Sequence, residues 1–369
     1  MSSQGAKTGF GEDRSHSLAT GGLPIKWEAK TKMPLVSVVV PTFRRWTHLL
    51  STIEDLLRQD YPAFEVIIVD QNSEWPTELI NARKVIEADP RIRWLTLDKP
   101  GVVRARNFGV NASNGSILLF TDDDVRIPSR HFIAKHAANY DDEGISSVTG
   151  REIPVARAQS AGLANRETLS PVPSGECTPR WNEQPAILQA LHFSRDSAQR
   201  YEVATFCTCN GSILRSEFYR IGGFDENFSG NSYGDDFDLA VRLSESGGRL
   251  IYDPQAALIH LQAPAGGLRL KDRQNTFSER DKAISTCLFV MRHSRKGCRW
   301  HLFYNHLLRK TILLKRNVIC FWQQPIVWWG VASAWNEARR RLREGPRSGL
   351  DTAKARADHQ PDLSLVSSK

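Results

Sequence analysis

The chain lacks the features of a disulfide-stabilised secreted protein. Its six cysteines in 369 residues include no Cys-x-x-Cys pair and no regular framework, so we expect reduced thiols in an intracellular, cytoplasmic protein. Cys207 and Cys209 are one residue apart, and side chains alternate across a strand, which makes the pair a poor start for a zinc site. Residues 1–33 contain no apolar stretch typical of a secretory signal, and we expect a disordered leader there.

Negative charge is scarce in one part of the chain. Residues 291–350 contain thirteen Lys or Arg and two Glu, a net charge of +11, whereas the whole chain carries +8. The remainder therefore carries −3, so a basic C-terminal region follows a mildly acidic body. The composition, with 40% hydrophobic and 24% charged residues, is ordinary for a globular protein and provides enough material for a core.

Four short, nearly continuous apolar runs alternate with helical patterns in the first third of the chain. Strands are predicted at residues 35–40, 64–69, 92–97 and 116–120, and helices at 47–59, at 76–87 and after Gly101. Such βα units form a right-handed, doubly wound parallel sheet, which binds ligands at the carboxyl ends of its strands. No Gly-x-Gly-x-x-Gly follows the first strand, which argues against a dinucleotide site.

Three consecutive carboxylates, Asp122–Asp124, follow the fourth predicted strand. A divalent cation would relieve their mutual repulsion, because hard cations bind carboxylate oxygens together with substrate phosphates. Taken alone, the triplet is equally compatible with a solvated acidic turn. Thr42 and Asp70 also lie at carboxyl ends of predicted strands, which places them at the same edge of the sheet.

The rest of the body reads as a mixture of elements. A helix is predicted at 128–140, and strands are predicted at 147–149, 203–206, 211–214, 249–252 and 257–260. Residues 152–200 are weakly periodic and rich in Pro, Ser and Ala, which is typical of a functional lid or a mobile loop. Asp235 and Asp236 open a further helix that stops before the glycines at 247 and 248.

Several short motifs follow one another between Leu35 and His260. They are Val40-Pro41-Thr42-Phe43, Val69-Asp70-Gln71-Asn72-Ser73, Gly101 with Ala105-Arg106-Asn107, Asp122-Asp123-Asp124, Gly222-Gly223-Phe224-Asp225-Glu226, Gly234-Asp235-Asp236 with Arg242, and His260. In this order they resemble family 2 glycosyltransferases, the nucleotide-sugar enzymes of the GT-A fold. The chain departs from the family at Arg44, where Asn is usual, and at Asp235, which replaces the usual Glu.

The resemblance implies an α/β fold of the GT-A (Rossmann-like) type, with a mostly parallel mixed sheet flanked by helices. The catalytic domain is then expected at residues 34–265. A basic, aromatic-rich helical extension is expected at 266–345, and a disordered tail at 346–369.

By this resemblance, Asp124 is the direct ligand of Mn²⁺ or Mg²⁺, Asp122 assists it or binds the ribose, and His260 completes the metal site. A lone His at a strand end is equally compatible with a structural role. Asp236, with Asp235 beside it, is implied as the general base, because a helix start stabilises the ionised carboxylate. The alternative is that either aspartate only caps the helix.

The nucleotide is expected to contact a second group of residues. By the resemblance these are Pro41, Thr42, Arg44, Asp70, Arg106, Asp122 and Asp123. Asp70 would accept a hydrogen bond from the N3–H of uracil. Arg104 competes with Arg106 for its role, and a solvated surface position is at least as compatible for Arg44 and Arg104. Asp123 should point to the other face of its extended segment.

These expectations describe an inverting glycosyltransferase that moves a sugar from a nucleoside-diphosphate sugar, UDP-linked, to an acceptor hydroxyl. One base carboxylate implies direct displacement. The acceptor would be a carbohydrate or a lipid-linked molecule, in polysaccharide, glycan or glycolipid synthesis of the cell envelope.

Two other functions are possible for a chain with this pattern of motifs. A nucleotidyltransferase of similar fold would need a Gly-rich basic loop after the first strand, and residues 42–45 contain no glycine. A non-catalytic carbohydrate-binding relative is disfavoured by intact aspartates at 122, 124 and 236.

The extension is rich in tryptophan, at positions 300, 322, 328, 329 and 335. Residues 318–335 carry no charge, but Gln323-Gln324-Pro325 interrupts their apolarity, so an interfacial helix fits better than a spanning one. A helix packed on the catalytic domain is equally compatible. An interfacial helix would give peripheral membrane contact through 300–343, on the inner face. No nucleic-acid-binding module is recognisable, and no nucleic-acid partner is expected.

Overall fold

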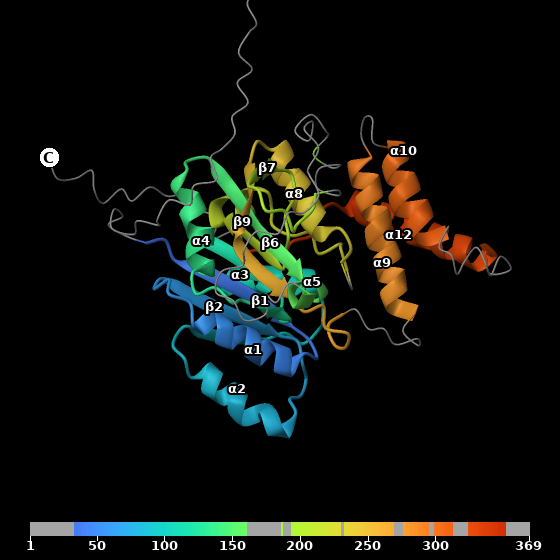
Figure 1. The fold of residues 1–369 in the computed structure, drawn as a ribbon. Coiled ribbons are helices and arrows are strands. Elements are labelled where there is room, and N and C mark those ends of the chain that lie inside the picture. The colour runs from blue at the N-terminus through green and yellow to red at the C-terminus, as the bar shows by residue number, and fades with distance from the viewer. Residues whose placement is uncertain are drawn as a thin grey trace, which may run out of the picture.

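The computed structural model describes residues 33–160, 186, 193–229, 232–268, 276–294, 299–312 and 324–351. The predicted leader, apart from Met33, lies outside the described residues, as do most of the predicted lid and the tail beyond Asp351. Within the described residues, helices cover a central sheet, and a group of C-terminal helices stands to one side of it (Figure 1).

One nine-stranded sheet forms the centre of the molecule. Its first part runs in the order β3-β2-β1-β4, and these parallel strands are β1 (Val36–Thr42), β2 (Phe64–Asp70), β3 (Ile92–Thr96) and β4 (Ile117–Thr121). The order continues β8-β6-β9-β5, with β7 paired to β9. These strands are β5 (Val125–Arg126), β6 (Ile145–Pro154), β7 (Tyr201–Val203), β8 (Asn210–Leu214) and β9 (Arg249–His260).

The sheet is mixed, because β8 is antiparallel to both β4 and β6 while β6 and β9 are parallel to each other. The βα repeat thus predicts only the half that ends at β4. The mixed sheet that the resemblance implied is confirmed.

Helices cover both faces because successive strand residues point to opposite sides of a sheet. Along β1, Val38 packs in one apolar cluster with α1 (Trp46–Leu57), whereas Val39 packs in another with α3 (Val102–Ala112). The remaining helices of the body are α2 (Ile80–Glu87), α4 (Phe132–Ala138), α5 (Val155–Ser160), α7 (Arg215–Arg220) and α8 (Asp235–Glu245), with 3-10 turns at Thr77–Leu79 and Asn139–Asp141. The two clusters hold the sheet rigid and fix the position of its carboxyl edge.

Two strand predictions need correction. The predicted strands at 249–252 and 257–260 form the single strand β9, because residues 254–256 bulge out opposite a register shift between Gly150 and Arg151 of β6. The strand predicted at 203–206 instead ends at Val203, where β7 ends, and the chain turns toward β8.

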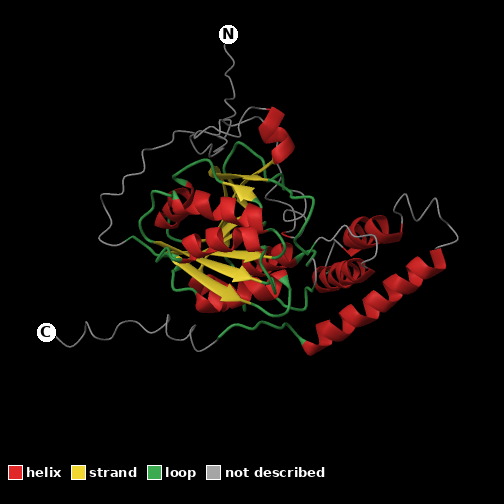
Figure 2. Ribbon diagram, turned by 90° about the horizontal axis from the view of Figure 1, so that it is seen from below, coloured by secondary structure: helices red, strands yellow, loops and turns green. Residues whose placement is uncertain are grey.

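The extension consists of α9 (Thr276–His293), α10 (Arg299–Leu302), a π-helical segment (Phe303–Ile312) and α12 (Gln324–Glu344). Figure 2 shows them together beside the body, with α12 the longest. Ala334 and Ala338 of α12 are buried in the same cluster as α9, but Trp328 and Trp329, one turn or two earlier, are 52% and 77% exposed. None of the described helices combines the length and the apolarity that crossing a membrane requires.

Residues 346–351, the first of the predicted disordered tail, lie against the body. The Arg347 carbonyl accepts a hydrogen bond from the backbone N–H of Glu226 (2.7 Å), and Gly349 donates to the Glu226 carboxylate (3.0 Å). The Asp351 N–H donates to the side chain of Asn111 (2.9 Å). These residues therefore fasten the end of α12 to the catalytic domain.

Candidate active site

A pocket of about 450 Å³ lies at the carboxyl edge of the sheet, where the parallel strands β1 and β4 end. The start of α8 and the end of β9 close it from the other side. Seven of the residues predicted from the sequence line it: Pro41, Arg106, Asp122, Asp123, Asp235, Asp236 and His260.

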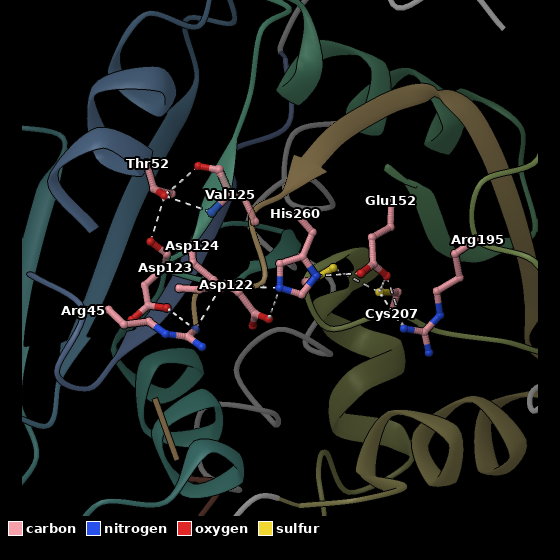
Figure 3. A network of polar contacts seen from close by, with 12 residues as sticks. Arg45, Thr52, Asp122, Asp123, Asp124, Val125, Glu152, Arg195, Cys207 and His260 are labelled. Carbon is pink, nitrogen blue, oxygen red and sulfur yellow. Dashed lines mark hydrogen bonds and ion pairs between the residues drawn. The ribbon is translucent and has the colours of Figure 1, made fainter. Parts of the chain in front are cut away.

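Asp122, Asp124 and His260 come together beside this pocket. His260 Nε2 lies 3.5 Å from Asp124 Oδ1 and 4.0 Å from Asp122 Oδ2, and one ligand atom from each residue lies within 4.8 Å of the others. Figure 3 shows His260 between the aspartates and Glu152. The β9 bulge and the short β5–β9 pairing, which aligns Val125 with His260, bring the histidine to the aspartate loop.

These three residues fit a divalent cation. Among the described residues, Asp124 Oδ1 makes no hydrogen bond of good geometry. Ion-pair contacts with Arg45 Nη1 (2.9 Å) and His260 Nε2 (3.5 Å) reach this buried oxygen, and a cation would take their place. The other oxygen of Asp124, Oδ2, accepts the backbone N–H of Ala263 (2.8 Å). Two carboxylates and an imidazole are a donor set that Mn²⁺ and Mg²⁺ accept.

The electrostatics of the cluster favour charged groups. Burial opposes ionisation of Asp124, but hydrogen bonding to His260 and the charge of Arg45 outweigh it and lower the pKa of this carboxyl. Burial likewise opposes protonation of His260, but its bonds to Asp124 and Glu152 raise its pKa to about 10, so a cation at Nε2 would have to displace the proton there. Glu152 is buried too, yet its bond to His260 and the charge of Arg195 lower its pKa to about 2.

Glu152 contacts the side of the His260 ring that faces away from the aspartates. Its Oε1 lies 2.6 Å from His260 Nδ1, which leaves Nε2 facing the aspartates. A carboxylate in this position fixes the ring orientation of a metal-binding histidine. Glu152 was missed by sequence reasoning, because it lies near the end of β6, in the segment that was predicted to be an irregular lid.

Asp123 has an internal role in this structure. Its Oδ2 accepts a hydrogen bond from the Thr42 hydroxyl (2.8 Å), and its Oδ1 accepts one from Arg45 (3.0 Å). Burial raises the pKa of Asp123 to about 7, against the opposing charge of Arg45. Thr42, which was predicted to contact the nucleotide, is therefore committed to Asp123 and does not line the pocket.

The arginine that reaches the aspartates is Arg45, and the predicted Arg44 does not. Arg44 has a left-handed backbone (φ 55°), donates its N–H to Asn72 (2.7 Å) and places its guanidinium over Phe43, 5.0 Å from the ring centre. Arg45 lines the pocket and Arg44 does not. The sequence alone does not reveal which of two neighbouring arginines in a loop turns toward the pocket.

Asp70, the predicted partner of uracil, is saturated by protein groups. Asn72 donates to its Oδ1 from both the backbone (3.0 Å) and the side chain (2.7 Å). The indole N–H groups of Trp75 and Trp94 donate to Oδ2, at 2.7 and 3.1 Å. Asp70 is 1% exposed and does not line the pocket, whereas the next residue, Gln71, does.

The two aspartates that open α8 have different surroundings. Asp235 Oδ2 is buried against Arg106 Nη1 (2.8 Å), and burial together with the nearby charge of Asp236 raises the pKa of Asp235 despite that arginine. Asp236 is more exposed, and its Oδ2 accepts a hydrogen bond from Arg195 Nη2 (3.0 Å). Gly234 permits the turn into the helix, because its φ is 93° and an added Cβ would lie 3.2 Å from Phe289.

Arg106 and Arg195 connect these aspartates to the metal-binding candidates. Arg106 Nη2 lies 3.4 Å from Asp122, so one guanidinium contacts both acidic motifs. Arg195 lies 3.5 Å from Glu152 in addition to its contact with Asp236. Arg195 was missed by sequence reasoning, since it belongs to the weakly periodic segment at 152–200 and to no motif.

Comparison with known proteins agrees with this arrangement. Residues 37–220 match the profile of the family described as "Glycosyl transferase family 2". The chain belongs to this family. The match covers the strands from β2 to β8, most of β1 and the Asp122–Asp124 motif, but it ends before Asp236, β9 and His260.

Relatives of this family 2 chain have named roles in sugar chemistry. It is 29% identical over 248 residues to the O-antigen biosynthesis protein RfbC of Myxococcus xanthus, an alignment that covers 65% of this chain and 18% of that protein. It is 28% identical over 233 residues to validoxylamine A glucosyltransferase of Streptomyces hygroscopicus subsp. jinggangensis, covering 59% and 53%. The chain thus matches less than two thirds of the length of these relatives.

Solved structures show the fold of the family 2 chain. S. aureus TarS 1–349 aligns with a TM-score of 0.53 at 16% identity, covering 82% of this chain and 80% of TarS. The same fragment in complex with UDP-GlcNAc aligns at 0.51 and 16% identity, covering 86% and 94%. The predicted GT-A fold is confirmed by this likeness.

Proposed function

We propose that this family 2 chain is a metal-dependent, inverting glycosyltransferase that moves a sugar from a nucleoside-diphosphate sugar to an acceptor hydroxyl. The observation that carries the proposal is a single pocket lined by Asp122 and His260 on one side and by Asp236 on the other. Leaving-group stabilisation and proton removal are the two services that sugar transfer needs, and the pocket offers a group for each.

The leaving diphosphate would lie at the metal side. Asp122, Asp124 and His260 would hold Mn²⁺ or Mg²⁺, which supplies positive charge against the departing phosphates. Arg106 offers a second positive charge in the pocket wall, and within the described part of the chain its buried Nε has no hydrogen-bond partner. A donor of this kind suits a phosphate oxygen.

The acceptor hydroxyl would lose its proton to Asp236. Arg195 donates a hydrogen bond to this carboxylate at 3.0 Å, which fixes its orientation. Asp235 is less suited, because its carboxylate is buried against Arg106. One available base carboxylate favours direct displacement, with inversion at the anomeric carbon.

A UDP-linked donor remains the proposal for the nucleotide, and the TarS complex with UDP-GlcNAc supports it. The base would meet Gln71 and Pro41 in the pocket wall and not the saturated Asp70. A carbohydrate or lipid-linked acceptor in polysaccharide synthesis is proposed from the named role of the RfbC relative.

The experiment pairs a donor screen with one substitution. UDP-, GDP- and TDP-sugars are tested for Mn²⁺-dependent hydrolysis and for thermal stabilisation of the chain. Asp236→Asn should lower donor hydrolysis or transfer by about 10²–10⁴-fold, because the base is lost, while the donor still raises Tm. Glu245→Gln, an exposed carboxylate on the same helix, is the matched control. Full activity of Asp236→Asn would contradict the assignment.

Peripheral membrane contact is proposed for the N-terminal part of α12. Ile326, Trp328 and Trp329 are exposed there by 73%, 52% and 77%, and residues 291–350 carry a net charge of +11. Exposed Trp beside basic residues suits the surface of an anionic bilayer. The Trp328→Ala/Trp329→Ala variant should sediment less with vesicles containing phosphatidylserine than the parent chain does. Val85→Ala, an equally exposed apolar position on α2, should not change sedimentation.

A further inference from the structure

Two thiols face each other at the back of the pocket. Residues 207–210 form a turn in which the Asn210 N–H donates to the Cys207 carbonyl (3.1 Å), so Cys207 and Cys209 do not alternate as they would on a strand. Their Sγ atoms are 3.3 Å apart, and the residues are 1% and 4% exposed. The turn thus brings both thiols to one side, and the one-residue spacing no longer argues against a zinc site.

A carboxylate completes a three-sided group with the thiols. Glu152 Oε2 lies 3.5 Å from Cys207 Sγ, and one ligand atom from Glu152, Cys207 and Cys209 lies within 4.8 Å of each of the others. Two thiolates on one tetrahedral Zn²⁺ lie about 3.8 Å apart, given Zn–S bonds of about 2.3 Å. The observed separation needs to widen by only a few tenths of an ångström.

Arg195 supplies the charge balance for such a group. Its Nη1 lies 3.2 Å from Cys207 Sγ and 3.5 Å from Glu152 Oε2. Two thiolates, one carboxylate and a Zn²⁺ ion carry a net charge of −1, and the guanidinium neutralises it. A hydrogen bond from a fixed donor to a ligating sulfur is a typical outer-shell contact of a metal site.

We propose that Glu152, Cys207 and Cys209 form a site for a thiophilic divalent cation such as Zn²⁺, separate from the one at Asp122, Asp124 and His260. Binding displaces one proton from each thiol to the solvent. The fourth ligand is a water molecule or a substrate atom that enters through the pocket, because Thr208, between the two cysteines, lines its wall. The carboxylate and two sulfurs select Zn²⁺ over Mg²⁺ and Mn²⁺, which prefer oxygen ligands.

The two sites share one residue. Glu152 presents Oε2 to the thiols and Oε1 to His260 Nδ1, at 2.6 Å. A cation on the thiols would fix the carboxylate that orients His260. Occupancy of the thiol site should therefore change the affinity of the other site for Mn²⁺.

The test measures metal binding by the full chain and uses no sugar nucleotide. The protein is purified with a non-thiol reductant, stripped with a chelator and dialysed against Zn²⁺, and bound zinc is counted by elemental mass spectrometry. We expect one thiol-dependent Zn²⁺ per chain, which Cys207→Ser and Cys209→Ser each abolish. Cys287→Ala, a buried thiol on α9 outside the group, keeps it. Asp124→Asn keeps it as well, which separates this site from the aspartate site.

A titration of the unsubstituted chain with Cd²⁺ guards against variants that fail to fold. Ultraviolet charge-transfer absorption from Cd–thiolate bonds should rise to a plateau at one equivalent and be absent in the Cys207→Ser/Cys209→Ser chain. Zinc content and absorption equal in the parent and the double variant would overturn the proposal. So would a parent chain that, under the same conditions, loses two hydrogen atoms in mass through a disulfide between Cys207 and Cys209.

Discussion

The two acidic motifs, Asp122–Asp124 and Asp235–Asp238, each contain a buried carboxylate that protein groups hold. Asp123 in the first motif still lines the pocket, whereas Asp238 in the second does not. Asp123 is held by Thr42 and Arg45, whereas Asp238 is held by Arg242 (2.8 Å), Arg292 (2.9 Å) and His293 (2.9 Å). The aspartates of one motif therefore differ in the groups that they contact.

The buried members differ in how many cations surround them. Three basic side chains outweigh the burial of Asp238 and lower its pKa, whereas Asp123 shares Arg45 with Asp124, and burial raises its pKa to about 7. Asp238 thus anchors the structure as a charge. Asp123 is held by the charge of Arg45 and by hydrogen bonds from Arg45 and Thr42, and a neutral group could keep only the hydrogen bonds.

The largest expected effect is on activity, at Asp124. Asp124→Asn should lower kcat by about a thousandfold or more, because several kcal/mol of charge stabilisation at the leaving diphosphate is lost. Asp123→Asn should cost far less, since the amide oxygen can still accept a hydrogen bond from Arg45 and the amide NH₂ can donate one to the Thr42 hydroxyl. Donor hydrolysis at saturating Mn²⁺ measures both. Equal losses of activity in the two variants would contradict the different roles assigned to Asp123 and Asp124.

Next in size is the stability of the second motif. Asp238→Ala should lower the free energy of unfolding by about 3–5 kcal/mol, because Arg292 and His293 are left as buried groups without their carboxylate. Urea denaturation followed by tryptophan fluorescence measures the change, with Glu245→Ala on the exposed end of α8 as control. If the two variants unfold at the same urea concentration, Asp238 is not an anchor.

A histidine with neutral partners provides the smallest and most specific effect. His136 lies 3.0 Å from Ser212 Oγ and 2.9 Å from Asn210 Oδ1, and burial lowers its pKa from 6.5 to about 4. Between these values the unfolded chain binds more protons than the folded chain. Stability is therefore full above pH 6.5 and falls as the pH drops toward 4, by about 3 kcal/mol.

The measurement is the free energy of unfolding at several pH values from 8 to about 4.5, for the parent and for His136→Gln. The variant should be less stable at pH 8 but should lose less stability on acidification, because it has no group to protonate. Parallel curves for the two chains would show that His136 does not titrate in this way.

Sequence patterns predicted the parallel half of the sheet well, because strands buried on both faces must be apolar almost throughout, as in residues 36–40 and 117–120. They failed at β9, where Pro254 reads as the end of a strand but is absorbed by a bulge. The motifs also located Asp122, Asp124, Asp236 and His260 at one pocket or its edge. The roles of these four residues stay predictions.

What the sequence could not reveal are the contacts made by side chains far along the chain. Nothing near Asp70 indicates that Trp94, twenty-four positions away, will occupy its carboxylate. Arg195 and Glu152 are forty-three positions apart and belong to no motif, yet they contact each other beside the pocket. Contacts of this kind depend on the path of the irregular segments, which local periodicity does not encode.

The ion pairs at Asp238 also bear on how the protein can be divided. Arg292 and His293 lie at the end of α9, so the C-terminal extension supplies positive charge to Asp238 on the helix that begins with Asp235. A shortened protein that stops at residue 265, the end of the predicted catalytic domain, would keep every residue that lines the pocket except Gly267, Leu268 and Lys282. It would still lose Arg292 and His293, which pair with the buried Asp238 of α8. The extension is therefore a part of the catalytic unit and not an interchangeable module.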